Sequence, residues 1–106
     1  MPAAVFSAAI DALFADPHLA LGVIYRSGGA DPGVPIRVIL RRPDRVGDLG
    51  ETRIVAGTVM IDIRVSEVAA PAEGDIIEAS GTVYVIQGEP IRDAEHLVWS
   101  IEARPA

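Results

Sequence analysis

The sequence predicts a mainly β protein: a small antiparallel barrel or sandwich of about six strands, preceded by one N-terminal α-helix. Several stretches alternate apolar and polar residues, and a period of two places successive side chains on opposite faces of a strand. Short, turn-like connections join these stretches and favour antiparallel pairing. With 106 residues, the chain suits a single domain that buries its own core. We therefore expect one domain spanning residues 1–106, with the helix confined to residues 1–16.

The predicted helix covers residues 3–15, where apolar side chains recur at helical spacing and form one stripe: Phe6, Ile10, Leu13 and Phe14. Asp16-Pro17 ends it, because proline disfavours helix at the residue before it. We expect the helix to cover one face or one end of the sheet. The alternative is that its apolar stripe docks on a neighbouring subunit.

Two strands are expected in the first half of the chain, at residues 19–26 and 35–41, since both segments alternate. Between them, residues 27–33 form a loop of turn residues. Its adjacent glycines resemble a phosphate cradle only superficially, because a strand follows and the chain has no lysine. Residues 54–60 lead into the next strand, with a kink expected at Gly57.

The second half carries the clearest strand patterns, and we expect strands at 61–65, 75–79, 82–86 and 97–103. Residues 66–71 are predicted to form a single helical turn that ends at Pro71. The turn at 72–75 allows Asp75 to bond its own backbone locally. Trp99 is expected to anchor the core, because its indole is the largest apolar side chain in the sequence.

The longest polar stretch is residues 41–53, which has mixed charge and little periodicity. Loops of this length in compact domains are usually functional or disordered. One interpretation is a solvated, mobile loop. The other is an arm that contacts a partner, whose candidate partner-facing residues are Arg41, Arg42, Arg45, Asp48 and Glu51.

The amino-acid composition excludes several classes of function. The net charge of −6 is unsuited to gripping DNA phosphates, which requires a cationic footprint, but it suits a surface past which DNA slides. Without cysteine there is no disulfide or thiolate chemistry, and two isolated histidines are too few for a standard zinc site. No signal peptide or membrane span is expected. Half of the residues are apolar and only 5% aromatic, so the core must rest on aliphatic side chains.

No catalytic motif is evident. Asp93, Glu95 and His96 lie close together in sequence, but their position between two predicted strands favours a structural hairpin turn over an acid–base or metal site. The serines have no histidine at a recognisable motif spacing. We therefore expect neither an enzyme nor a cofactor or metal site.

The order of elements, together with a few residues of the second half, resembles a known family. Ser66-Glu67 follows a strand, Gly74-Asp75 opens a hairpin, Tyr84 lies in its return strand, and the chain closes on Leu97-x-Trp99. In these features the chain is similar to the head–tail joining proteins (head-completion or stopper proteins) of long-tailed bacteriophages and phage-derived gene-transfer particles. The similarity is most specific over the last 45 residues or so and extends over the rest through element order.

This resemblance implies a structural virion protein without enzymatic activity. Copies would form a homo-oligomeric ring, a hexamer in the particle, below the portal and adaptor ring and above the tail-terminator ring. The ring would close the DNA channel after packaging, let double-stranded DNA pass through its lumen and provide the platform for the tail. Assembly would take place in the bacterial cytoplasm, without membrane contact.

Two alternatives stay open. The first is another ring protein of the same particle, of the tail-terminator or adaptor type. The second is a small β-barrel module that binds nucleic acid or another polymer, a class that uses cationic grooves with exposed aromatic side chains.

Overall fold

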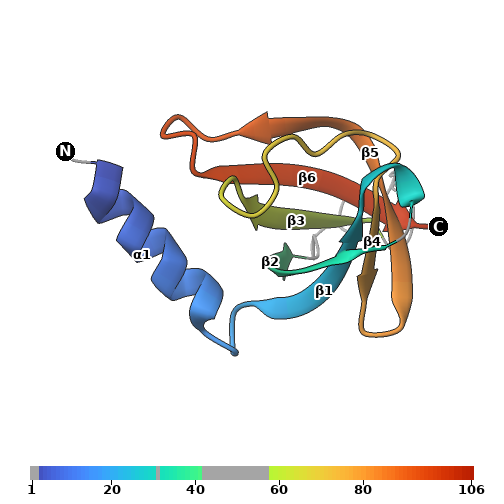
Figure 1. Cartoon of the computed structure of the whole chain (residues 1–106), viewed down its shortest axis with the longest axis horizontal. Helices are drawn as coiled ribbons and strands as arrows, with labels where there is room; N and C mark the ends of the chain where they lie inside the picture. The colour runs from blue at the N-terminus through green and yellow to red at the C-terminus, as the bar shows by residue number, and fades with distance from the viewer. Residues whose placement is uncertain (1–2, 31, 42–57) are drawn as a thin grey trace, which may run out of the picture.

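The computed structural model describes residues 3–30, 32–41 and 58–106. Its strands form a closed barrel in the order β1-β2-β3-β6-β5-β4, with every neighbouring pair antiparallel (Figure 1). The elements, in chain order, are α1 (Ala3–Ala15), β1 (Leu21–Arg26), the 3-10 turn η1 (Ser27–Gly29), β2 (Val34–Arg41), β3 (Val59–Arg64), β4 (Ile76–Ala79), β5 (Thr82–Arg92) and β6 (Val98–Pro105). The prediction of a mainly β, six-stranded antiparallel fold with one N-terminal helix is confirmed, and the structure selects the barrel over the open sandwich.

Alternation along the strands fills the barrel with aliphatic side chains. Ile61 and Ile63 of β3 are fully buried, and Ile61 lies opposite the equally buried Ile101 of β6. Burial of one such side chain contributes roughly 1.5–3 kcal/mol. The interior is thus a packed core, as expected for a barrel of so few strands.

Trp99 lies on the predicted face of β6, but it is only half-buried and packs against the core from one end of the barrel. Its indole Nε1 donates a hydrogen bond to the carbonyl oxygen of Val68 at 3.0 Å, which ties β6 to the segment after β3. The expectation that Trp99 anchors the core is therefore corrected: the interior is occupied by aliphatic side chains with Tyr25 and Tyr84, and the indole has a polar partner near its edge.

The connections differ in detail from the prediction. The amides of Glu67 and Val68 both bond to the carbonyl oxygen of Arg64, so the expected helical turn is a hydrogen-bonded turn rather than a regular helix. Strand β5 runs to Arg92, beyond the predicted end, past an irregularity that begins after Gln87 and contains Gly88 at φ 77°. The segment 54–57, with the predicted kink at Gly57, lies outside the described residues.

Helix α1 stands beside the barrel and joins it through the turn that leads into β1 (Figure 1). Phe14 is buried, and Phe6 and Ile10 are half-buried, as the predicted stripe requires. Leu13, however, is exposed. Successive helical residues are about 100° apart, so a face centred between Ile10 and Phe14 leaves Leu13 outside it.

Candidate assembly interface

Arg41 is the one predicted partner-facing residue within the described part of the chain. The others, Arg42, Arg45, Asp48 and Glu51, lie outside it, as does most of the predicted loop 41–53. Arg41 ends β2, and its Nε and Nη2 atoms donate to the two carboxylate oxygens of Asp62 on β3 at 3.1 and 2.8 Å. This hydrogen bonding raises the pKa of the Arg41 guanidinium above its usual value. Arg41 is thus fixed by β3, although half of its side chain is exposed where the predicted loop begins.

A cluster that sequence reasoning missed attaches α1 to the barrel; we call it the helix anchor, and its members are Asp11, Phe14, Arg37, Arg64 and Glu67. Arg37 points outward from β2 and donates through Nε to the carbonyl oxygen of Phe14 at 2.7 Å. Its Nη2 donates to the carbonyl oxygen of Ala20 at 3.1 Å. One side chain therefore binds both the end of α1 and the turn that follows it.

Arg64 of β3 is the second cation of the helix anchor. It pairs with Asp11 of α1 at 3.1 Å and with Glu67 at 2.5 Å, and its guanidinium carbon lies 5.1 Å from the centre of the Phe14 ring. A guanidinium over an aromatic face gains electrostatic attraction from the ring. Burial alone would lower the pKa of Arg64, but the hydrogen bonds to Glu67 and Asp11 outweigh this effect and hold the pKa above its usual value. Arg64 therefore stays charged and couples helix and barrel.

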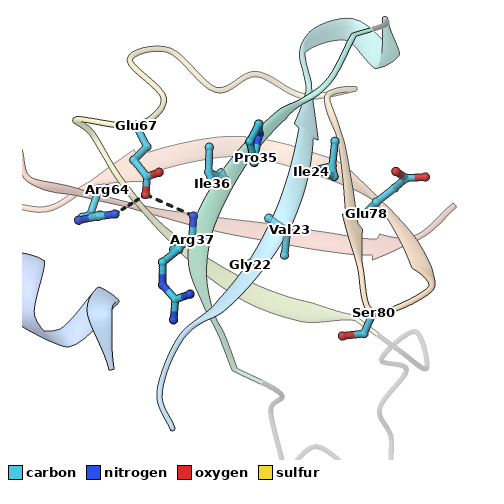
Figure 2. A pocket seen from close by; sticks show the side chains of 10 residues that line it. All are labelled: Gly22, Val23, Ile24, Pro35, Ile36, Arg37, Arg64, Glu67, Glu78 and Ser80. Atoms are coloured by element: carbon cyan, nitrogen blue, oxygen red, sulfur yellow. Dashed lines mark hydrogen bonds and ion pairs between the residues drawn. The ribbon is translucent and has the colours of Figure 1, made fainter. Parts of the chain in front are cut away.

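A groove of about 530 Å³ lies on the outward face of β1 and β2. In Figure 2, Arg37, Arg64 and Glu67 gather at one end of the groove, and Glu78 and Ser80 lie at the other. The strand segments 22–24 and 35–36 line the apolar stretch between these ends. We call it the β1–β2 groove.

Two of the charged groups at the ends of the β1–β2 groove, Arg64 and Glu78, are ion-paired within the chain. Arg64 is bound by Glu67 at one end, and Glu78 is bound by Arg26 at 2.5 Å at the other. A catalytic site needs a positioned acid, base or nucleophile that can reach a substrate. Paired charges around an apolar floor instead suit contact with another apolar surface.

Asp75 is a buried carboxylate that joins the turn before β4 to β1 and η1. Its Oδ1 accepts from the amide of Gly28 at 2.7 Å, and its Oδ2 accepts from the amide of Ala72 at 3.0 Å and from the hydroxyl of Tyr25. Burial, with the added effect of the Asp75 hydrogen bond, raises the pKa of Tyr25 far above its usual value, so the phenol stays neutral. The local backbone bond predicted for Asp75 is confirmed, whereas the two partners in β1 and η1 were not predicted.

The acidic residues at 93–96 form a structural turn, as predicted. Oδ1 of Asp93 accepts hydrogen bonds from the amides of Leu97 and Val98 at 2.7 and 3.0 Å, which closes the hairpin between β5 and β6. Desolvation opposes the charged form of Asp93, but these backbone hydrogen bonds prevail and lower its pKa. Among the residues that the structure describes, no group of three or more potential ligands could hold a metal ion. No helix in the described ranges is both long and apolar enough to span a bilayer.

A family model described as Phage Head-Tail Attachment protein matches residues 2–103 of this chain. The chain belongs to this family. The match includes the first half, for which the sequence resemblance rested on element order. No curated protein and no solved structure gave a significant match.

Membership of the head–tail attachment family makes the chain a structural component of the virion that interacts with head and tail components of a phage. For a protein of this kind, the functional sites are surfaces that contact other proteins of the virion. Three features of the described surface are relevant: Arg41, the helix anchor and the β1–β2 groove. The sequence places Arg37 and Arg64 on outward faces of strands, but only the three-dimensional structure shows that α1 is their partner.

Proposed function

We propose that copies of this chain form a homo-oligomeric ring, a hexamer in the particle, within the head–tail connector. The ring closes the DNA channel after packaging and provides the platform on which the tail assembles. The observation that carries this proposal is the family match over residues 2–103. The neighbours in this arrangement are the portal and adaptor ring above and the tail-terminator ring below. Such a subunit assembles in the bacterial cytoplasm and ends in the virion, or in a phage-derived gene-transfer particle.

Charge supports passage of DNA through such a ring. The net charge is −6, and tight binding to DNA phosphates requires clusters of Lys or Arg that release counterions. A ring of anionic subunits repels the phosphates, so DNA moves through without adhering to the lumen. In this proposal, the segment 41–53 reaches inward as a gate or along the axis towards an adjacent ring, and Arg42, Arg45, Asp48 and Glu51 contact the partner.

The nucleic-acid-binding alternative has less support from the described surface. Binders of single strands stack bases on exposed aromatic side chains along a cationic groove. Here Phe14, Tyr25 and Tyr84 are buried. Arg92 lies over Trp99, with 5.3 Å between the guanidinium carbon and the ring centre, so part of the indole face is also covered. The aromatic side chains serve the fold rather than a stacking surface.

Removal of the gene from the producing phage or particle tests the proposed function. We expect filled heads that lose DNA and carry no tails, and we expect purified protein to restore tail joining when added to heads but not when added to tails alone. Cryo-electron microscopy of complete particles should place a six-membered ring of this chain between adaptor and tail terminator. Tailed, infectious particles without the chain would contradict the proposal. If purified protein restored tail joining when added to tails, the tail-terminator alternative would be favoured.

A further inference from the structure

The solvent-facing side of α1 is mostly apolar. The exposed residues of α1 are Val5, Ala8, Ala9, Asp11, Ala12, Leu13 and Ala15, with Val5 53% and Leu13 45% exposed. Helices on protein surfaces normally place charged and polar residues towards solvent, whereas a helix that is apolar all round is buried. The single charged residue of α1 is Asp11, and its carboxylate is bound to Arg64. The exposed face of α1 is therefore a largely apolar surface that the described residues do not cover.

The β1–β2 groove is a second uncovered apolar surface, and it is concave. Its floor includes Gly22, where an added Cβ would meet no atom within 4 Å, so no described part of the chain fills the space above β1 there. Ile24 and Pro35 continue the apolar lining. The charged groups at both ends already have partners: Arg64 and Glu78 are ion-paired, and Arg37 donates to backbone carbonyl oxygens. Covering the groove therefore leaves none of these groups without a partner.

We infer that the exposed face of α1 from one copy lies in the β1–β2 groove of the next copy. The inference rests on the proposed ring and names the contact that builds it. A helix that lays its apolar face into an apolar groove is a recurrent mode of protein recognition. Because the two surfaces differ, the contact is heterologous, and a heterologous contact whose rotation closes generates a ring.

Electrostatics favours a second copy as the occupant. Each copy carries a net charge of −6, so copies repel unless they meet through neutral surfaces. Asp11, the single charged residue of α1, is bound to Arg64. The groove presents two ion pairs, Arg64–Glu67 and Arg26–Glu78, and Arg37, whose guanidinium donates to backbone carbonyl oxygens. The helix anchor holds the opposite face of α1 on its own barrel through Arg37 and Arg64, which keeps the apolar face directed away from it.

The natural chain contains no cysteine, so engineered pairs report the contact without background. Ala9→Cys on α1 and Pro35→Cys in the groove, combined in one chain and oxidised in assembled particles, should link copies in series, up to the full ring on a non-reducing gel. As the matched control, Ala9→Cys is combined with Glu102→Cys on β6, which is separated from β1 by two strands in either direction around the barrel. This control should give no linked ladder.

A second pair of variants provides a readout independent of disulfide formation. Leu13→Glu should abolish incorporation of the chain into particles, whereas Ile91→Glu, at a more exposed apolar position of 69%, should leave incorporation unchanged. Circular dichroism and thermal unfolding of the purified variants should match those of the natural chain, which separates lost assembly from lost folding.

The outcomes distinguish the inference from the proposed function. A ring of this chain that shows neither the serial cross-links nor a Leu13→Glu defect overturns the helix-in-groove contact and leaves the proposed function intact. Cross-linking by Ala9→Cys alone would indicate symmetric helix–helix contact and also overturn it. If the Leu13→Glu chain failed to enter particles but no serial cross-links formed, the exposed face of α1 would be assigned to contact with another virion protein. This result would also overturn the helix-in-groove contact. Absence of any ring of this chain in the connector removes the proposed function and the inference together.

Discussion

Arg37 Nε donates a hydrogen bond to the carbonyl oxygen of Phe14 at 2.7 Å, so a strand of the barrel binds the C-terminal end of the helix that precedes it. The last carbonyl groups of a helix have no partner within the helix. Because the bond is made by a cationic side chain, it also opposes the negative end of the helix dipole. The barrel therefore determines where α1 points.

Replacing this side chain should loosen the helix and spare the barrel. Arg37→Met retains much of the apolar stem but removes both donors, and hydrogen bonds from a charged group are worth about 2 kcal/mol. We expect the free energy of unfolding to fall by about that amount, with faster amide exchange in α1 and unchanged exchange in β3 and β6. Arg104→Met, at an exposed position of β6, is the matched control and should behave like the natural chain. Unchanged exchange in α1 would show that Arg37 does not hold the helix.

The buried carboxylate of Asp75 should be among the most sensitive positions in the chain. Asp75→Ala leaves the Tyr25 hydroxyl and the amides of Gly28 and Ala72 without their acceptor. Leaving the buried Tyr25 hydroxyl and two part-buried amides without an acceptor should lower the free energy of unfolding by about 3 kcal/mol, measured by chemical denaturation. Glu95→Ala, which removes an exposed carboxylate at the hairpin tip, should change stability by less than about 0.5 kcal/mol. Similar values for the two variants would contradict the proposed importance of Asp75.

Tyr25 should make stability depend on alkaline pH. Burial and the Asp75 hydrogen bond raise its pKa in the fold above the ordinary value of 10.0, so the unfolded chain loses this proton first. The stabilisation is fully present below pH 10 and is lost as the pH rises beyond it, by about 1.4 kcal/mol per pH unit. Tyr25→Phe should be less stable near neutral pH but should lose less stability between pH 10 and 11.5. The free energy of unfolding is measured by urea denaturation at each pH. If it changed with pH in the same way for both proteins, this role of Tyr25 would be excluded.

Deletion of Asp44–Gly50 tests the proposed role of the long polar segment in the particle. We expect the shortened chain to fold with an unchanged far-ultraviolet circular dichroism spectrum and to enter particles that leak DNA or lack tails. A variant with seven Gly and Ser residues in the same place retains the length and tests whether the side chains matter. Normal particles from both variants would remove this segment from the mechanism.

Strand alternation made much of the barrel predictable from the sequence. The inward positions of Ile61 and Ile63 follow from a period of two, and the structure confirms them. Closure could not be predicted, because it depends on pairing of β1 with β4, whose partners Ile24 and Glu78 lie far apart in sequence. Alternation defines the faces of a strand but not its neighbours.

The assembly surfaces were less predictable than the fold. Arg37 and Arg64 could be placed on outward faces of strands, yet their roles follow from the position of α1, which depends on packing across the barrel. The exposed position of Leu13 was missed because the apolar stripe was drawn too wide for the surface that α1 covers. Of the five predicted partner-facing residues, the structure describes Arg41 alone and pairs it with Asp62.

The pairing of β1 with β4 has a further consequence for a protein made in many copies. In the described part of the chain, every strand of the closed sheet has two hydrogen-bonded neighbours, so no strand forms an open edge of the sheet. Free sheet edges are templates for intermolecular strand addition and lead to fibrous aggregates. Copies of this chain therefore have no open sheet edge through which to associate by strand addition, and association is left to side-chain surfaces that recognise a correctly formed neighbour.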